Sequence, residues 1–302
     1  MVKFQTIINY LDTHQLKYKT LEKTADLTSF KVGGVANIVV YPESINQLIE
    51  VVRLVTDYKC KHFILGNGTN TVFSDNLYDG VIIVTRYIDE CAFDGEYLVA
   101  QCGATINKAC KMACNCSLSG LEFAYGIPGS IGGAVYMNAS AFNGSISDVA
   151  YECLVFDKES RMTFKLSGNE LGFNKKTSIF STNKSLVLLS ATFKLMTGKR
   201  EEVSKLMAEH LKRRIDSQPL DLPSAGSVFK RPNNHYASRL IDECGLKGMR
   251  IGGAEVSKKH AGFIVNVNNA TASDVRLLAC RVKEIIKEKL NISLEEEIIF
   301  VE

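Results

Sequence analysis

The chain has 302 residues, of which 46% are hydrophobic and 23% are charged. This composition is typical of globular proteins and excludes the disordered, collagen-like and coiled-coil classes. The 36 Lys and Arg residues against 33 Asp and Glu residues give a net charge of +3. That charge is too nearly balanced for a dedicated nucleic-acid binder. We therefore expect about two globular domains and no nucleic-acid partner.

The sequence also indicates the cellular compartment of the protein and whether its cysteines are thiols or disulfides. No apolar stretch is long enough for a transmembrane helix, and residues 1–10 lack the apolar run of a signal peptide. We expect a cytoplasmic protein with no membrane partner, in which the nine cysteines are thiols. Cys110, Cys114 and Cys116 have neither a CxxC spacing nor a nearby histidine. We interpret them as small apolar residues on a helix and predict no metal site.

In chain order, the first predicted elements form a small α/β unit over roughly 85 residues. Ser44 is placed to cap a helix whose apolar residues recur at helical spacing. These residues are Ile45, Leu48, Ile49, Val52 and Val55. The short apolar runs 62–65 and 81–84 predict buried strands, and the first of them leads into a glycine turn at 66–68.

A second section is predicted to run to about residue 197, where the charged stretch 197–202 marks a boundary. It contains strand-like segments at 97–100, 154–156 and 186–195 and one helix at 105–116. Beyond the boundary, apolar spacing predicts helices over 203–211 and 275–286, the latter capped near Thr271 or Ser273. The last predicted strands are 263–267 and 298–301.

Two glycine-rich segments are candidates for holding phosphate. In the first, Gly66-Asn67-Gly68-Thr69-Asn70, the glycines let successive backbone N–H groups converge on an anion. The segment is not a Rossmann fingerprint, because Thr71 stands where the third glycine belongs, and it is not a Walker A loop. A hairpin turn without a ligand explains this segment at least as well.

The second segment, residues 120–134, has four glycines and a proline within Gly126–Gly133, so it cannot form a regular helix or strand. Its apolar flanks indicate a rigid backbone packed against a flat or anionic ligand. The alternative is a buried glycine-rich crossover without a ligand. Elsewhere, the cluster Lys212-Arg213-Arg214 is suited to a small anion.

At this point the motifs resemble those of a known family, the UDP-N-acetylenolpyruvoylglucosamine reductases, also called UDP-N-acetylmuramate dehydrogenases, in their shorter subtype. The most specific match is GLEFAYGIPGSIGGAVYMN at 120–138. Further matches follow in the expected order along nearly the whole chain. They are TSFKVGG at 28–34, the turn 66–70, SAGSVFKRP at 224–232, CGLKG at 244–248, GGA at 252–254, HAGFIVN at 260–266 and LEEEI at 294–298.

This resemblance implies an α+β fold. A two-subdomain FAD-binding domain of the vanillyl-alcohol-oxidase (PCMH) type would occupy residues 1–88 and 89–197. A C-terminal α/β substrate domain would occupy 198–302. The implied activity is reduction of UDP-N-acetylglucosamine enolpyruvate to UDP-N-acetylmuramate for peptidoglycan. Noncovalent FAD and the co-substrate NADPH would take part, and the protein would be a monomer.

The resemblance also assigns roles to residues. Ser227 matches the proton donor and Glu297 the glutamate that polarises the substrate, with Glu295 as a rival for that role. Arg214, Lys230 and Arg231 are candidates for the UDP phosphates or the carboxylate, or else are surface cations. His260 is expected to be a structural hydrogen-bonding residue. The cofactor would be held by Gly66, Asn67, Gly68, Thr69, Asn70, Gly126, Ile127, Pro128, Gly129, Ser130, Gly132 and Gly133.

The sequence departs from the family pattern at one substrate-binding position. Lys175 and Lys176 stand where the family carries a Tyr-Arg pair whose arginine clamps the substrate carboxylate. Lysine keeps the positive charge but lacks the two-pronged grip of a guanidinium. Three hypotheses follow: a reductase with Lys176 in the clamp, a binding paralogue with little or no turnover, and a related flavoprotein oxidase. The intact Ser227 and Glu297 segments favour the first.

Overall fold

The computed structural model describes residues 2–232 and 235–302, which form two compact units. Unit 1 comprises the chain up to Thr20, Ile38–Asn67 and Gly80–Arg213. Unit 2 comprises Leu21–Asn37, Gly68–Asp79 and Arg214–Glu302. Each unit is therefore assembled from separate stretches of the chain. The predicted boundaries at 88 and 197 stay a prediction.

A four-stranded sheet with the order β1-β2-β5-β3 is formed early in the chain. Its strands are β1 (Tyr18–Lys23), β2 (Val35–Val40), β5 (Tyr78–Val84) and β3 (His62–Leu65). The pair β3–β5 is parallel, with Leu65 opposite Val84. Two helices belong to the same part, α1 (Val2–Thr13) and α2 (Ile45–Asp57). Ser44 Oγ accepts the Gln47 N–H at 3.2 Å, which confirms the predicted cap of α2.

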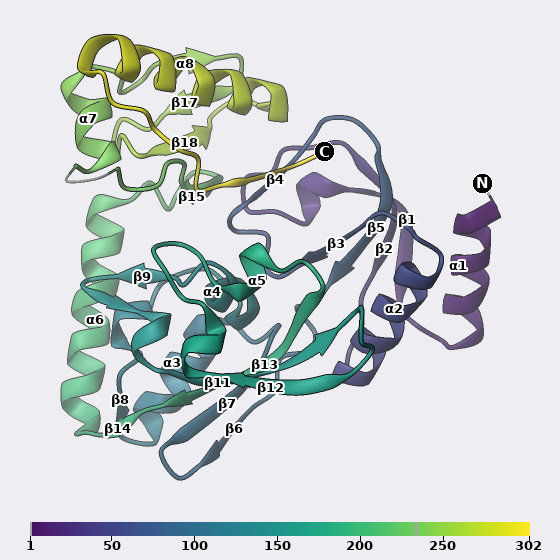
Figure 1. Cartoon of the computed structure of the whole chain (residues 1–302). Helices are drawn as coiled ribbons and strands as arrows, with labels where there is room; N and C mark the ends of the chain where they lie inside the picture. Colours follow the sequence, from purple (N-terminus) through teal and green to yellow (C-terminus); the bar gives the residue numbers. More distant parts are fainter. Residues whose placement is uncertain (1, 233–234) are drawn as a thin grey trace. The chain divides into compact units, whose positions relative to one another are not determined.

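Another sheet, which lies wholly in unit 1, is antiparallel with the order β12-β11-β13-β7-β6. Its strands are β12 (Thr163–Ser167), β11 (Ala150–Asp157), β13 (Leu186–Lys194), β7 (Tyr97–Gln101) and β6 (Cys91–Asp94). The helices α3 (Ile106–Asn115), α4 (Ile131–Tyr136) and α5 (Ile179–Thr182) pack against β7 and β13 (Figure 1). Cys110 and Cys114 are buried in this core, whereas Cys116 is exposed.

Shorter elements complete unit 1. The two-stranded pairs join β8 (Leu118–Ser119) to β14 (Met196–Thr197) and β9 (Ser140–Ala141) to β10 (Gly144–Ser145). The 3-10 helices of unit 1 include η2 (Glu122–Ala124), η3 (Ile146–Asp148) and η4 (Gly168–Leu171), and η1 (Thr24–Asp26) lies in unit 2. The long helix α6 (Arg200–Ser217) runs across the division between the units at Arg213.

Unit 2 contains an antiparallel sheet with the order β15-β18-β17-β16. Its strands are β15 (Ser224–Ser227), β18 (Phe263–Asn266), β17 (Ala254–Val256) and β16 (Arg250–Ile251), with α7 (Ala237–Glu243) and α8 (Ala272–Leu290). A parallel pair joins β4 (Thr71–Phe73) to β19 (Ile299–Val301). Thr271 caps α8 as predicted, and the Asp75 carboxylate accepts the N–H groups of Ala272 and Ser273 at 2.8 and 2.9 Å.

Helical and strand patterns were therefore reliable where apolar spacing was regular. The predicted helices correspond to α2, α3, α6 and α8, and the predicted strands to β3, β5, β7, β11, β13, β18 and β19. No helix in the described ranges combines the length and apolar character needed to cross a bilayer. Among the described residues, no group of three or more His, Cys, Asp and Glu side chains is arranged to hold a metal ion.

One half-buried polar pair in unit 1, His62 and Lys158, makes stability depend on pH. His62, in β3, contacts the Cys60 carbonyl through Nδ1 at 3.0 Å and Lys158 Nζ through Nε2 at 3.3 Å. A carbonyl only accepts, so Nδ1 carries the proton and Nε2 accepts from lysine. Burial, reinforced by the Lys158 charge, holds the pKa of His62 below its usual value. The folded chain therefore favours the neutral imidazole.

We predict that stability falls as the solution is acidified from about pH 7.5 to about pH 5.5. The folded state binds fewer protons at His62 than the unfolded state does, so the free energy of unfolding rises with pH. The contribution is present above the ordinary pKa of histidine and is lost below it. Urea unfolding across this range should give a shallower slope for His62→Gln than for the parent. Equal slopes would contradict this account.

Candidate functional site

In unit 1, the first glycine turn begins where two parallel strands end. Gly66 and Asn67 directly follow β3, whose partner β5 ends beside it at Val84. Ligands of open α/β sheets commonly bind outside the carboxyl ends of such strands. A Cβ added to Gly66 would lie 2.2 Å from Ser130 Oγ, so only glycine allows this approach. The first and second glycine segments thus meet within unit 1.

The second glycine segment is held by backbone hydrogen bonds rather than left as a linker. Gly126, with φ of +86°, donates its N–H to Asn107 Oδ1 at 2.7 Å. Ser130 caps α4, since its Oγ accepts the Gly133 N–H at 3.2 Å. Gly132 N–H donates to the Cys102 carbonyl at 2.8 Å. The segment therefore presents a fixed backbone, but the prediction that it forms no regular helix is wrong at its end, because Ile131–Tyr136 is helix α4.

The rest of the first glycine turn belongs to unit 2. Gly68 has φ of +64°, and a Cβ there would lie 2.3 Å from the Leu27 carbonyl oxygen. Ser29 N–H donates to the Gly68 carbonyl at 3.0 Å. Beside it, Thr28 is only 2% exposed, and within the described ranges its Oγ1 has no hydrogen-bond partner. A buried hydroxyl of this kind fits a phosphate oxygen, which would accept its proton.

The Ser227 side chain lies on an irregular strand of unit 2. In β15, Ser224 pairs with Val265 and Ser227 with Phe263, with a register shift between them. Gly226 adopts φ of +77° inside this bulge. A bulge re-aims the side chain that follows it, which is a common feature beside reacting groups. Ser227 is half-buried, so its hydroxyl is within reach of a ligand.

Glu297 is brought beside the Ser227 segment by strand-like pairing. Its N–H donates to the Val228 carbonyl at 2.8 Å, and Phe229 forms an isolated bridge with Glu296. Asn70 holds the same residue through its carbonyl group, because the Asn70 side-chain amide donates to the Glu297 carbonyl at 3.1 Å. Residues separated by 70 positions in the sequence are therefore neighbours in unit 2.

The three consecutive glutamates have different surroundings. The rival Glu295 forms an ion pair with Lys230, and Glu296 forms one with Lys283. The Glu297 side chain is half-buried and follows the residue that bridges to Phe229. This arrangement favours Glu297 over Glu295 as the residue that acts with Ser227.

Lys176 lies in a tight turn of unit 1. Asn174 and Thr177 exchange backbone hydrogen bonds at 3.1 and 3.2 Å, and Lys176 has φ of +58°. The turn is anchored by Asn138, whose buried side-chain amide donates to the Asn174 carbonyl at 3.1 Å. Lys176 is half-buried, whereas the adjacent Lys175 is exposed.

The other predicted cations have distinct environments. Arg214 is buried, with 7% exposure, which distinguishes it from a surface cation. Arg231 is exposed, and its guanidinium lies 3.8 Å from the ring centroid of Tyr236. Lys230 pairs with Glu295, as described above. All three belong to unit 2, as do Ser227 and Glu297, while Lys176 belongs to unit 1.

His260 is held as a structural residue. Its Nδ1 accepts the Gly262 N–H at 3.2 Å, and its ring packs edge-on against Phe263 at 5.0 Å. Burial lowers the pKa of His260, an effect that the charge of Lys247 reinforces. This environment favours the neutral ring, whose Nδ1 is hydrogen-bonded within its own turn.

Sequence reasoning missed two residues that support the site. Asn138, the last residue of the 120–138 motif, also accepts the Ser147 N–H at 2.9 Å, so it joins three segments of unit 1. Thr28 was part of a recognised motif but was given no role. An Asn and a Thr in loops carry no periodic signal, so only their places inside these motifs could have marked them.

Comparison with known families identifies the class of protein first. Residues 36–161 match the family model described as an FAD binding domain, and residues 218–301 match the C-terminal domain of UDP-N-acetylenolpyruvoylglucosamine reductase. The chain is thus a flavoprotein with a dedicated C-terminal domain. The predicted fold class, an FAD-binding domain of this type joined to a C-terminal substrate domain, is confirmed.

Full-length relatives then define the family. A UDP-N-acetylenolpyruvoylglucosamine reductase from Caldicellulosiruptor bescii is 45% identical over 97% of this chain and 91% of the relative. One from Pseudothermotoga lettingae is 46% identical over 90% and 93%. The crystal structure of the Thermus caldophilus enzyme superposes with a TM-score of 0.79 at 31% identity, covering 95% of this chain and 99% of that one. The chain belongs to the UDP-N-acetylenolpyruvoylglucosamine reductase family.

We predict that Gly68→Ala destabilises the protein by about 2 kcal/mol more than Gly245→Ala does. Both glycines lie in unit 2 with positive φ, of +64° and +72°. A Cβ at Gly245 meets nothing within 4 Å, whereas one at Gly68 collides with the Leu27 carbonyl. Chemical unfolding of the two variants measures the difference, and equal losses would show that the turn at Gly68 is not constrained by this contact.

Proposed function

We propose that this chain reduces UDP-N-acetylglucosamine enolpyruvate to UDP-N-acetylmuramate, a step of peptidoglycan precursor synthesis, with FAD as cofactor and NADPH as co-substrate. The observation that carries the assignment of roles is the pairing in unit 2 that sets Glu297 beside the Ser227 segment. Family membership over nearly the whole chain supports the reaction itself. The protein acts in the cytoplasm as a monomer.

The residues that hold FAD come from the two glycine segments. In the first segment, we assign the backbone N–H groups of Gly66, Asn67, Gly68, Thr69 and Asn70 to the diphosphate of FAD. The segment Gly126–Gly133 offers FAD a fixed backbone surface, because the N–H groups of Gly126, Gly132 and Gly133 already donate within the protein. Tight packing at Gly66 and Gly68 supports this role, because a preformed backbone cradle binds an anion at little conformational cost.

The reaction adds a hydride and a proton across the alkene of an enol ether. When bound, FAD would supply the hydride, with NADPH as the source of its electrons. The hydride goes to the terminal alkene carbon, and negative charge develops on the adjacent carbon and its carboxylate. Ser227 Oγ then gives its proton to that adjacent carbon and recovers one from solvent.

A serine hydroxyl is a weak acid, so the site must stabilise the developing charge before the proton moves. Glu297 acts on the substrate beside Ser227, where it helps to polarise the enol ether. Lys176 supplies positive charge to the substrate carboxylate. Arg214, Lys230 and Arg231 serve the UDP phosphates, since cations of this kind neutralise phosphate oxygens.

The competing interpretations gain no support from the described residues. A binding paralogue has no need of a bulged serine strand paired with a glutamate segment. An oxidase acting on another substrate has no need of the dedicated C-terminal domain. The reductase accounts for both features together.

The decisive experiment follows NADPH oxidation by the purified, FAD-loaded protein while UDP-N-acetylglucosamine enolpyruvate is varied. The expected result is NADPH consumption that depends on this substrate and yields UDP-N-acetylmuramate. A flavin-loaded protein that ignores the substrate would overturn the proposed reaction. A protein that cannot be loaded with FAD would overturn the flavoenzyme assignment itself.

We predict that Lys176→Arg raises the rate of substrate reduction by about ten- to a hundredfold. Arginine restores a second charge-assisted hydrogen bond to the carboxylate that lysine cannot make. The neighbouring Lys175→Arg is the matched control, because Lys175 is exposed and Lys176 is half-buried. If both variants keep the parental rate, Lys176 does not serve as the carboxylate clamp.

A further inference from the structure

Arg86 differs from most arginines of the chain. Its Nε is buried and, among the described residues, has no hydrogen-bond partner. Burying a guanidinium nitrogen without an acceptor is costly, so such a group marks a place where a ligand supplies the acceptor. Seven other arginines each donate to a protein oxygen. They are Arg53, Arg161, Arg200, Arg239, Arg250, Arg276 and Arg281.

Arg86 lies at the same sheet edge as the first glycine turn. It is two residues past Val84, and Asn67 is two residues past Leu65, the partner of Val84 in the parallel pair β3–β5. The two strands stay hydrogen-bonded past their ends, because Thr85 N–H donates to the Leu65 carbonyl at 2.9 Å. The backbone of Arg86 therefore lies beside the start of the first glycine turn in unit 1.

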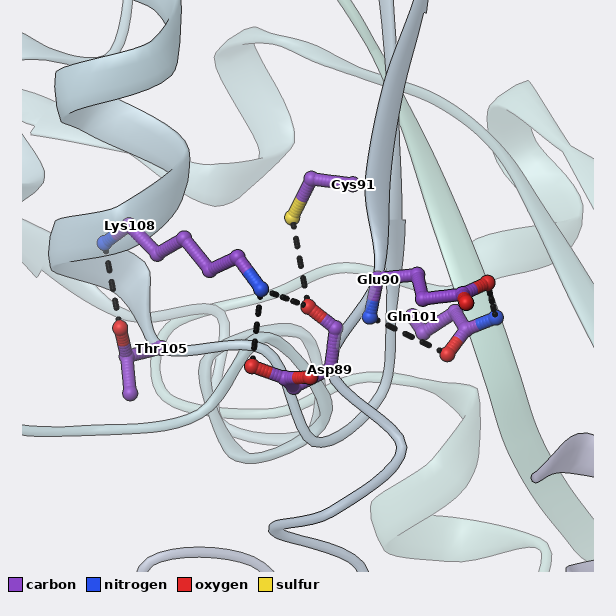
Figure 2. Close-up of polar contacts among 6 residues, drawn as sticks. All are labelled: Asp89, Glu90, Cys91, Gln101, Thr105 and Lys108. Carbon is purple, nitrogen blue, oxygen red and sulfur yellow. Dashed lines mark hydrogen bonds and ion pairs between the residues drawn. The ribbon is translucent and has the colours of Figure 1, made fainter. Parts of the chain in front are cut away.

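The backbone around Arg86 is fixed on both sides. Ile88 N–H donates to the Thr85 carbonyl, and Gly103 N–H donates to the Ile88 carbonyl, each at 2.9 Å. Figure 2 shows Lys108 reaching from α3 to Asp89, where Nζ contacts the backbone oxygen at 2.6 Å and Oδ2 at 2.8 Å. A tight turn pinned in this way holds its side chain for a ligand at low entropic cost.

The same scaffold holds the second glycine segment. Ile131 and Gly132 donate their N–H groups to the carbonyls of Ala104 and Cys102, both at 2.8 Å. Between those two residues, Gly103 packs so closely that a Cβ would lie 1.8 Å from the Thr85 carbonyl oxygen. The short stretch 102–104 therefore fixes the Arg86 turn and the 126–133 segment against each other.

We propose that Arg86 binds the diphosphate of the flavin dinucleotide. The inference rests on the proposed function, since it assigns a further residue to the same cofactor. A planar guanidinium matches two phosphate oxygens at once, and a diphosphate offers the acceptor that Nε lacks. The first glycine turn supplies N–H groups to this anion but no full positive charge, which Arg86 adds.

The test compares ligand affinities of the apoprotein and its Arg86→Met variant by isothermal titration calorimetry. The variant is expected to bind FAD about ten- to a hundredfold more weakly, as for the loss of a charge-assisted hydrogen bond. ADP, which carries the diphosphate without the flavin ring, should lose affinity to a similar extent. Riboflavin, which lacks the diphosphate, should bind the variant and the parent equally.

Two further variants separate this role from a structural one. Arg281→Met removes a charge from an exposed ion pair on α8 and should leave FAD affinity unchanged. Arg86→Lys keeps the charge without the fork and should lose less affinity than Arg86→Met. The apoprotein of Arg86→Met should unfold at the same temperature as the parent or higher, because an unsatisfied buried nitrogen is removed.

Each unfavourable result has a distinct meaning. Equal FAD affinity of parent and Arg86→Met overturns the inference and leaves the flavoenzyme intact. An equal loss for riboflavin shows that Arg86 contacts the flavin ring, which also overturns the diphosphate assignment. A clear loss of apoprotein stability shows a structural arginine. A parent protein that binds no FAD overturns the proposed function itself.

Discussion

The site depends on one hydrogen bond, from the Glu297 N–H to the Val228 carbonyl at 2.8 Å. With the bridge between Phe229 and Glu296, it sets the end of the chain against the strand that carries Ser227. The Asn70 amide joins the same segment from the first glycine turn. Because backbone pairing fixes register, these bonds decide which glutamate stands beside the serine.

Backbone hydrogen bonds also fix the candidate cofactor site in unit 1. The stretch 102–104 provides carbonyls for the glycine segment and packs against the turn that carries Arg86. The first glycine turn forms no regular structure, and the second segment stays irregular over 125–130 before α4 begins at Ile131, yet each is held by its neighbours. A rigid backbone with few side chains suits a large anionic cofactor, since the backbone approaches it without steric hindrance. In the proposed function, the chemistry of the sugar substrate falls to side chains such as Ser227.

Much of the fold was predictable because α2 and α8 have regular apolar spacing and clear caps, and the parallel strands are short apolar runs. The glycine segments were recognisable by composition. The resemblance assigned the substrate-polarising role to Glu297 with Glu295 as a rival. Composition alone could not separate these two glutamates, since strand register and ion pairs such as that of Lys230 depend on distant residues. Arg86 gave no signal either, because an arginine after a strand reveals its missing partner only once the chain is folded.

Ser227 and Glu297 are proposed to act on the same reacting substrate. A double-mutant cycle tests this with Ser227→Ala, Glu297→Gln and the double variant, measured as reoxidation of the NADPH-reduced flavin by the substrate. Each single change should slow this step by about a hundredfold or more, and the double variant should be about as slow as the slower single one. Effects that multiply in the double variant would contradict the account, because they would show that the two residues act independently.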